Sequence, residues 1–193
     1  MPVKTEWQAP HAEQRCTCGA TVWLTGLPSS GKTTIAHAVA DRLRREGRRA
    51  EVLDGDELRT TLCAGLGFGR EDRDTNVRRI GLVAEVLARN GILALVPVIA
   101  PYADSRAHVR ERHRASGTTY LEVHVSTPVD TCAERDVKGL YAQQRAGRIT
   151  GLTGVDDPYE PPVEPELTIP AGKQSVDTST ALLWDLLAQR RLI

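Results

Sequence analysis

Residues 26–33 read Gly26-Leu27-Pro28-Ser29-Ser30-Gly31-Lys32-Thr33, which fits the phosphate-binding loop pattern of Gly, four residues, Gly, Lys and then Ser or Thr. The two glycines permit backbone angles at which consecutive N–H groups point at one polyphosphate. Lys32 supplies a positive charge for the β- and γ-phosphate oxygens, and the Thr33 hydroxyl can ligate Mg²⁺. The pattern therefore predicts a site for a nucleoside triphosphate, with ATP and Mg²⁺ as the expected cofactors.

The segments on either side of the loop match the context that this motif requires. Residues 20–25 are apolar and rich in β-forming side chains, and residues 34–43 have helical periodicity. The helix would direct its positive end at the same anion, so Thr34 joins the residues expected to contact the triphosphate. A chance glycine turn is the alternative, and it would not explain a strand, a loop and a helix in this order.

Length and composition favour one domain of ordinary size. The chain has 193 residues and a net charge of zero, from 25 basic and 25 acidic side chains, so nothing suggests a nucleic-acid or membrane surface. No apolar run approaches the roughly 20 residues that span a bilayer. The first residues contain no apolar signal segment. We therefore expect a cytoplasmic protein that binds neither nucleic acid nor membrane.

The four cysteines are expected to be thiols, because disulfides are rare in the cytoplasm. Cys16 and Cys18 form a Cys-X-Cys pair, but no second pair or nearby histidine completes a zinc site. Cys63 and Cys132 are isolated and are interpreted as packing or surface residues. Residues 1–19 are polar with scattered proline and glycine, and we interpret them as an N-terminal arm before a single domain over 20–193.

Strand and helix patterns alternate along the rest of the chain. Further strands are expected at 50–53, 92–96, 120–125 and 166–169, and helices at about 34–46, 71–87, 104–116, 128–135 and 176–190. This alternation predicts a three-layer α/β fold with a parallel sheet. The helix at about 104–116 is strongly basic, and its arginines are expected to be solvated charges; they are Arg106, Arg110, Arg112 and Arg114.

Acidic side chains follow the strand at 50–53. The carboxyl ends of parallel strands line the ligand crevice, so Asp54 and Asp56 are expected near the phosphate loop, with Arg59 one helical turn beyond Asp56. Asp56 could instead be an ordinary helix N-cap. Asp54 is the stronger candidate, because a carboxylate at a strand end that faces ATP can hold Mg²⁺ or orient a hydroxyl.

A second group of candidates surrounds Phe68, the only phenylalanine of the chain, in the glycine-rich loop at 65–70. Arg73 and Asn76 follow on one face of the next helix, and propensity alone leaves open whether they bind a ligand or are surface residues. Residues 137–157 combine glycines with Lys138, Arg145 and Arg148. A mobile cationic segment of this kind is typical of a lid that neutralises transferring charge and excludes water.

Together these motifs resemble the adenylylsulfate kinase family, from about residue 20 to the C-terminus. The motifs are Trp23-Leu24-Thr25-Gly26, the phosphate loop, Asp54-Gly55-Asp56 with Arg59, Glu71-Asp72-Arg73 with Asn76-Val77-Arg78-Arg79, Pro97-Val98-Ile99, Arg135-Asp136-Val137-Lys138-Gly139-Leu140-Tyr141, and Thr153-Gly154-Val155-Asp156. Each is weak alone, and in this order they are highly specific. The resemblance implies a P-loop kinase with a five-stranded parallel sheet, a homodimer, and transfer of phosphate from ATP to the 3′-hydroxyl of adenosine 5′-phosphosulfate.

The resemblance also implies roles for individual residues. Asp54 would orient the 3′-hydroxyl and help to hold Mg²⁺ with Thr33, Lys32 and Lys138 would be the catalytic cations, and Arg135 would cover the adenine of ATP. The adenylylsulfate would be held by Asp56, Arg59, Phe68, Arg73, Asn76, Ile99, Lys138 and Leu152. Phe68 offers a stacking face for adenine, and the two arginines can meet the phosphosulfate anion.

The chain departs from the family pattern at two positions. Ala100 stands where many members have a serine that is often described as a phosphorylation site, and Leu152 stands where many have phenylalanine. A methyl group cannot accept a phosphoryl group, so we expect direct in-line transfer. Two other functions remain open from the sequence: another small-molecule P-loop kinase, acting on a nucleoside, gluconate or shikimate, and a non-catalytic nucleotide-binding partner of a sulfurylase.

Overall fold

The structure of the chain is a computed structural model that describes residues 19–193. Within these residues the strands form one parallel sheet of five in the order β2-β3-β1-β4-β5. The strands are β1 (Ala20–Thr25), β2 (Ala50–Val52), β3 (Leu93–Pro97), β4 (Thr119–Val125) and β5 (Leu167–Ile169). This confirms the predicted five-stranded parallel sheet. The predictions for the N-terminal arm and for Cys16 and Cys18 lie outside the described residues.

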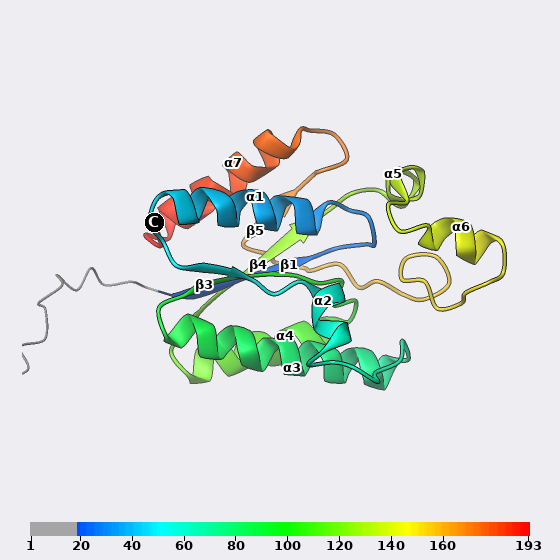
Figure 1. The fold of residues 1–193 in the computed structure, drawn as a ribbon, viewed down its shortest axis with the longest axis horizontal. Helices are drawn as coiled ribbons and strands as arrows, with labels where there is room; N and C mark the ends of the chain where they lie inside the picture. Colours follow the sequence, from blue (N-terminus) through cyan, green and yellow to red (C-terminus); the bar gives the residue numbers. More distant parts are fainter. Residues whose placement is uncertain (1–18) are drawn as a thin grey trace, which may run out of the picture.

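Helices cover both faces of the sheet and make the three layers (Figure 1). One face carries α1 (Lys32–Arg45) and α7 (Val176–Gln189), and the other carries α3 (Arg70–Arg89) and α4 (Ala103–Ala115). Three shorter helices, α2 (Gly55–Thr60), α5 (Val129–Arg135) and α6 (Leu140–Arg145), lie beyond the carboxyl ends of the strands. Ligands of open α/β sheets bind at that end, so these short helices surround the expected site.

The central strand β1 explains why the core has two halves. All six of its residues are buried, and successive side chains of a strand point to opposite faces. Val22 and Leu24 pack in the cluster under α1 and α7, whereas Trp23 packs in the cluster under α3 and α4. A strand covered on both faces reads as a near-continuous apolar run, and residues 20–25 are apolar except for two buried threonines.

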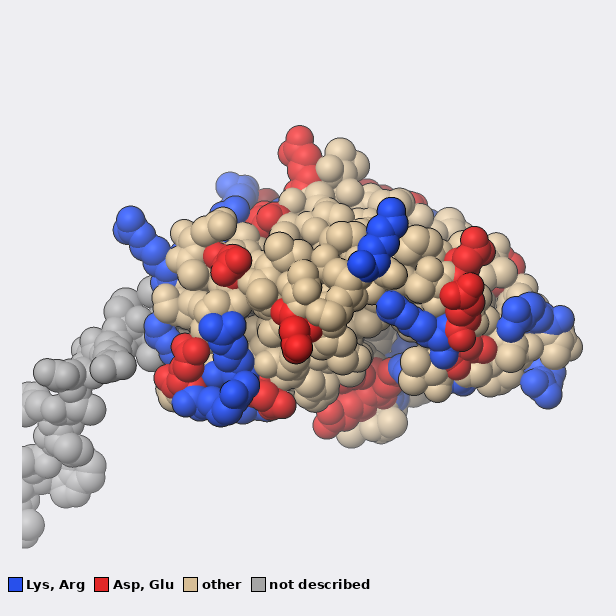
Figure 2. All heavy atoms as spheres, turned by 90° about the horizontal axis from the view of Figure 1, so that it is seen from above, with Lys and Arg blue, Asp and Glu red and all other residues tan. Residues whose placement is uncertain are grey.

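The charged surface agrees with the net charge of zero. On the face that carries α1 and α7, basic and acidic side chains are interspersed (Figure 2). No helix of the described part of the chain is long and apolar enough to span a bilayer.

One alternative and one expectation about charged residues were wrong. The N-cap of α2 is Asp54, whose carboxylate accepts a hydrogen bond from the Asp56 amide at 2.8 Å, so Asp56 is not the cap. Of the four arginines expected to be solvated, Arg112 and Arg114 are exposed, whereas Arg110 is half-buried and pairs with Glu122 and Glu166. Arg106 is not solvated; only 3% of it is exposed, and its Nε donates to Glu122 Oε1 at 2.7 Å. The carboxylate that pairs with it comes from β4, which a pattern within one helix does not reveal. Cys63 and Cys132 are buried packing residues, as expected.

Candidate active site

A cavity of about 640 Å³ lies beyond the carboxyl ends of β1, β2 and β3. Its lining joins the phosphate loop to segments that are distant in sequence. The predicted site residues that line it are Pro28, Ser29, Ser30, Gly31, Lys32, Thr33, Thr34, Asp56, Arg59, Phe68, Arg73, Asn76, Ile99, Arg135 and Lys138. The structure therefore brings most of the two predicted groups, one for the triphosphate and one for the acceptor, into a single space. The predicted residues that do not line it are Gly26, Leu27, Asp54 and Leu152.

The phosphate loop turns tightly between β1 and α1. Gly26 has φ 154°, and a Cβ added there would lie 2.5 Å from the carbonyl oxygen of Val125 on the neighbouring strand β4. Gly31 has φ 106° and is the N-cap of α1. Both positions thus require glycine, the first for the close approach and the second for its left-handed conformation. The N-terminus of α1, with its unpaired N–H groups, therefore lies at the cavity.

The Lys32 ammonium group is held inside the loop. Its Nζ donates hydrogen bonds to Gly26 O at 2.9 Å, Leu27 O at 2.7 Å and Ser30 Oγ at 3.3 Å. Burial lowers the pKa of Lys32 from its ordinary value to about 7. An anion close to the loop would oppose this shift, because an opposite charge favours the protonated amine. Triphosphate binding and the charge of Lys32 are therefore coupled.

Thr33, in the first turn of α1, is hydrogen-bonded to Asp54, the N-cap of α2. The Thr33 hydroxyl donates to Asp54 Oδ2 at 2.8 Å, while Asp54 Oδ1 caps α2. A hydroxyl and a carboxylate oxygen suit Mg²⁺, which prefers oxygen ligands and keeps several waters and phosphate oxygens around it. In the described part of the chain, no group of three or more His, Cys, Asp or Glu side chains could hold a metal. The two residues fit a magnesium ion that is completed by nucleotide and water.

The acceptor end of the cavity is built from α2 and the loop that follows it. Arg59 Nη1 donates to Leu66 O at 3.2 Å and to Gly67 O at 3.1 Å, and its guanidinium lies 4.4 Å from the centroid of the Phe68 ring. Phe68 is 65% exposed, which is unusual for so large an apolar side chain. Arg59 fixes one side of the ring, and the exposed aromatic surface is available to a flat ligand.

Arg73 and Asn76 are buried, which excludes the interpretation of these two as surface residues. Arg73 joins α3 to the lid: Nε donates to Phe68 O at 2.6 Å, Nη1 to Thr153 Oγ1 at 2.7 Å and Nη2 to Gly151 O at 2.7 Å. Asn76 Oδ1 is buried and has no hydrogen-bond partner among residues 19–193. Since Asn76 lines the cavity, a ligand donor there would satisfy this oxygen.

The predicted lid, residues 137–157, contains helix α6 and contacts both ends of the site. Lys138 forms an ion pair with Asp56 of α2 across the cavity. Tyr141 Oη donates to Pro28 O of the phosphate loop at 3.1 Å. Arg135, just before the lid, donates to Ser30 O at 3.4 Å and to Ala171 O at 2.8 Å.

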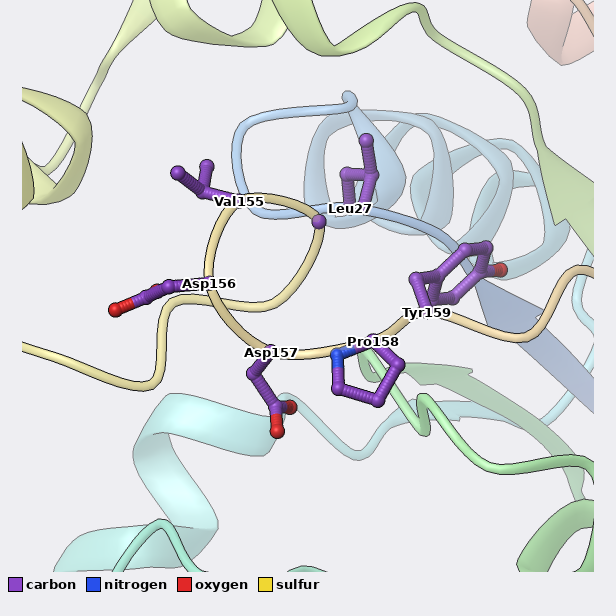
Figure 3. A pocket seen from close by; sticks show the side chains of 7 residues that line it. Leu27, Val155, Asp156, Asp157, Pro158 and Tyr159 are labelled. Carbon is purple, nitrogen blue, oxygen red and sulfur yellow. The ribbon is translucent and has the colours of Figure 1, made fainter.

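Leu152 is not brought into the cavity. It packs with Cys132 and Tyr141 in a small cluster of its own, against Leu27. The following loop lies beside Leu27 and forms a separate hollow at residues 154–159 (Figure 3). A Cβ added to Gly154 would lie 2.5 Å from Leu27 Cδ2, so the lid and the phosphate loop are in close contact. The acceptor role expected for Leu152 from the family resemblance stays a prediction.

Comparison with known proteins places these residues in a family. The protein-family profile described as "Adenylylsulphate kinase" matches residues 18–170. The chain belongs to the adenylylsulphate kinase family. The probable adenylyl-sulfate kinase of Synechocystis sp. is 51% identical over 175 residues, which are 91% of this chain and 97% of that protein. The adenylyl-sulfate kinase of Rippkaea orientalis is 50% identical over 171 residues, 89% of this chain and 92% of that protein.

A solved structure agrees with this assignment. The APS kinase of Mycobacterium tuberculosis, in complex with AMPPNP and APS, superposes with a TM-score of 0.86 at 46% identity, over 88% of this chain and 98% of that one. The similarity confirms the expected P-loop kinase fold and the resemblance to adenylylsulphate kinases.

Sequence reasoning missed some contacts that shape this adenylylsulphate kinase site. Thr153 and the Gly151 carbonyl hold Arg73, and Asp157 lies 3.7 Å from the same guanidinium. The Thr25 hydroxyl, at the end of β1, donates to Ile99 O at 2.6 Å. Thr25 and Thr153 both fall in segments that carry the family resemblance, but nothing in the local sequence indicates their partners.

Proposed function

We propose that the protein transfers the γ-phosphoryl group of ATP to the ribose 3′-hydroxyl of adenosine 5′-phosphosulfate, which gives 3′-phosphoadenylylsulfate and ADP. The observation that carries this proposal is the single cavity that connects the phosphate loop with Asp56, Arg59, Phe68 and Asn76. A kinase needs donor and acceptor in one water-poor space, with the acceptor hydroxyl in line with the transferring phosphoryl group. The membership of the adenylylsulphate kinase family supports this acceptor over other small molecules.

On the donor side, residues 26–34 hold the phosphates, chiefly through backbone N–H groups, which Pro28 lacks, and Arg135 lies over the adenine. Lys32, whose amine is buried in the phosphate loop, would supply a positive charge to the transferring group. Thr33 and Asp54 would hold Mg²⁺, which supplies charge neutralisation at the β- and γ-phosphates when bound. Asp54 would also orient the 3′-hydroxyl and accept its proton.

On the acceptor side, Phe68 stacks on the adenine, and Arg59 and Arg73 meet the phosphosulfate anion. Arg73 donates three of its five N–H groups to protein oxygens, which leaves one on Nη1 and one on the Nη2 that lies 3.7 Å from Asp157. Lys138 approaches the phosphates when the lid closes. In the structure it instead forms an ion pair with Asp56. The remaining contacts with adenylylsulfate come from Asp56, Asn76 and Ile99.

The two arginines are expected to differ when replaced by alanine. Arg59→Ala should raise the KM for adenylylsulfate and leave ATP affinity similar, since its other hydrogen bonds are to one local loop. Arg73→Ala should raise the same KM and also lower the Tm, because it leaves the buried Thr153 hydroxyl and two carbonyls without their donor. Titration of each ligand and thermal unfolding measure the difference. Equal weakening of both ligands by Arg59→Ala would contradict the assignment of that residue to the acceptor.

Transfer is expected to be direct, without a phosphorylated enzyme. Ala100 is buried beside the cavity-lining Ile99 and Pro101, and its methyl group cannot accept phosphate. Protein incubated with γ-labelled ATP and no acceptor should therefore carry no stable label. A stoichiometric phosphoprotein that passes its label to adenylylsulfate would overturn in-line transfer.

The function is tested by direct detection of 3′-phosphoadenylylsulfate from purified protein, ATP, Mg²⁺ and adenylylsulfate. ADP release with a nucleoside, gluconate or shikimate, and none with adenylylsulfate, would favour another small-molecule kinase. ATP binding with no turnover would favour a non-catalytic partner of a sulfurylase. We also propose, from the family resemblance, that the protein is a homodimer in the cytoplasm, and light scattering of the purified protein measures the oligomeric state.

A further inference from the structure

The turn between β3 and α4 has an unusual backbone where it borders the cavity. Ile99 and Pro101 line the cavity, and Ala100 between them has φ 43° and is buried. This left-handed conformation is unfavourable for a residue with a side chain, so the surroundings must hold it. The turn is therefore a part of the site whose shape depends on contacts made behind it.

Three consecutive carbonyl oxygens of this turn each accept a hydrogen bond from a different segment. Thr25 Oγ1 of β1 donates to Ile99 O at 2.6 Å, and Arg106 Nη1 of α4 donates to Ala100 O at 2.8 Å. The Glu160 amide, from the segment after the lid, donates to Pro101 O at 2.8 Å. None of the three donor residues lines the cavity, so these bonds hold the turn without occupying the space of a ligand.

Arg106 also connects the turn to the end of the lid. Its Nη2 donates to Glu160 O at 2.7 Å, and its Nε pairs with Glu122 on β4. Tyr159, the residue before Glu160, lies with its hydroxyl 3.1 Å from Thr25 Oγ1. The planar guanidinium thus bonds three separate segments at once, which the single amine of a lysine would not reproduce.

We propose that Arg106 and Thr25 are positioning residues for the acceptor. They hold the turn at residues 99–101 in its left-handed conformation and fix the exit of the lid against it. Neither side chain lines the cavity, so both act through the backbone that Ile99 and Pro101 present to the ligand. The inference rests on the proposed function, because the acceptor nucleoside is the ligand expected at this turn.

Arg110 provides a matched control for the other role that Arg106 could have, which is to neutralise Glu122. Arg110 donates to the same carboxylate, at Glu122 Oε2 and 3.2 Å, and to Glu166 at 2.8 Å. Its hydrogen bonds do not reach the 99–101 turn. A purely structural role for the ion-pair network would therefore give Arg106→Gln and Arg110→Gln the same kinetic behaviour.

The test compares steady-state kinetics of the two variants, with adenylylsulfate and ATP varied separately. Loss of a charge-assisted hydrogen bond to the turn should raise the KM for adenylylsulfate about tenfold in Arg106→Gln. In Arg106→Gln the KM for ATP and kcat should change by less than about twofold. In Arg110→Gln both KM values and kcat should change by less than about twofold. Equal KM values for adenylylsulfate in the two variants would overturn the proposal.

Thr25→Val keeps the proposal testable if Arg106→Gln does not fold. Valine keeps the size and the branched shape of threonine and removes only the hydroxyl that bonds Ile99 O. We expect the same selective rise in the KM for adenylylsulfate, by about threefold to tenfold for a neutral hydrogen bond. An unchanged KM would overturn the positioning role of the turn.

Wild-type protein that forms no 3′-phosphoadenylylsulfate would overturn the proposed function and this inference together, whereas an active wild type with unaffected variants overturns the inference alone.

Discussion

Replacing Lys32 with alanine is expected to lower turnover by roughly 10²–10³-fold or more, which is typical for a charge that acts on a transferring phosphoryl group. The amine is buried in the phosphate loop and lies against the carbonyls of Gly26 and Leu27. The loop conformation depends on its glycines and on main-chain contacts, so alanine should remove the charge and leave the backbone shape. Stopped-time assays of 3′-phosphoadenylylsulfate formation measure the loss.

Lys173→Ala is the matched control, because this lysine is exposed and does not line the cavity. Its turnover should equal that of the wild type. Circular dichroism and thermal unfolding show whether the Lys32 variant is folded. A folded Lys32→Ala protein with near-normal turnover would mean that the loop is not the catalytic phosphate site.

Asp54→Asn is expected to lower turnover by about 10²–10⁴-fold, the usual range for a group that takes part in proton transfer, and to weaken acceptor binding much less. Asparagine is as good an N-cap as aspartate, so the hydrogen bond from the Asp56 amide that begins α2 can be kept. The substitution therefore removes the negative charge beside Thr33 without removing the helix cap. The split between kcat and the KM for adenylylsulfate is the measurement.

Asp41→Asn, on the exposed side of α1, controls for the loss of one acidic charge and should leave both parameters unchanged. If Asp54→Asn changed only the KM for adenylylsulfate, Asp54 would be a binding residue and its catalytic role would be wrong. The Mg²⁺ concentration that gives half-maximal activity should also rise in Asp54→Asn, because a carboxylate is a better magnesium ligand than an amide.

Much of the fold was predictable because its signals are local. An apolar run of strand length, a glycine-rich loop and a helix period identify β1, the phosphate loop and α1 within 30 consecutive residues or so. The parallel sheet follows from strands that alternate with helices. Asp54 was a candidate for a similar reason, since a strand end in such a sheet opens onto the ligand crevice.

The sequence by itself determined the strand–helix order, the phosphate loop and the family, because each depends on residue types at short, defined spacings. Only the tertiary structure decided which charged side chains are buried. Arg106 shares a basic helix with the exposed Arg112 and Arg114, yet Glu122 on β4 and the Glu160 carbonyl accept its hydrogen bonds. Arg73 is held in the same way by residues about 80 positions further along the chain. The burial of a charge depends on partners that folding brings together, and helical periodicity carries no information about them.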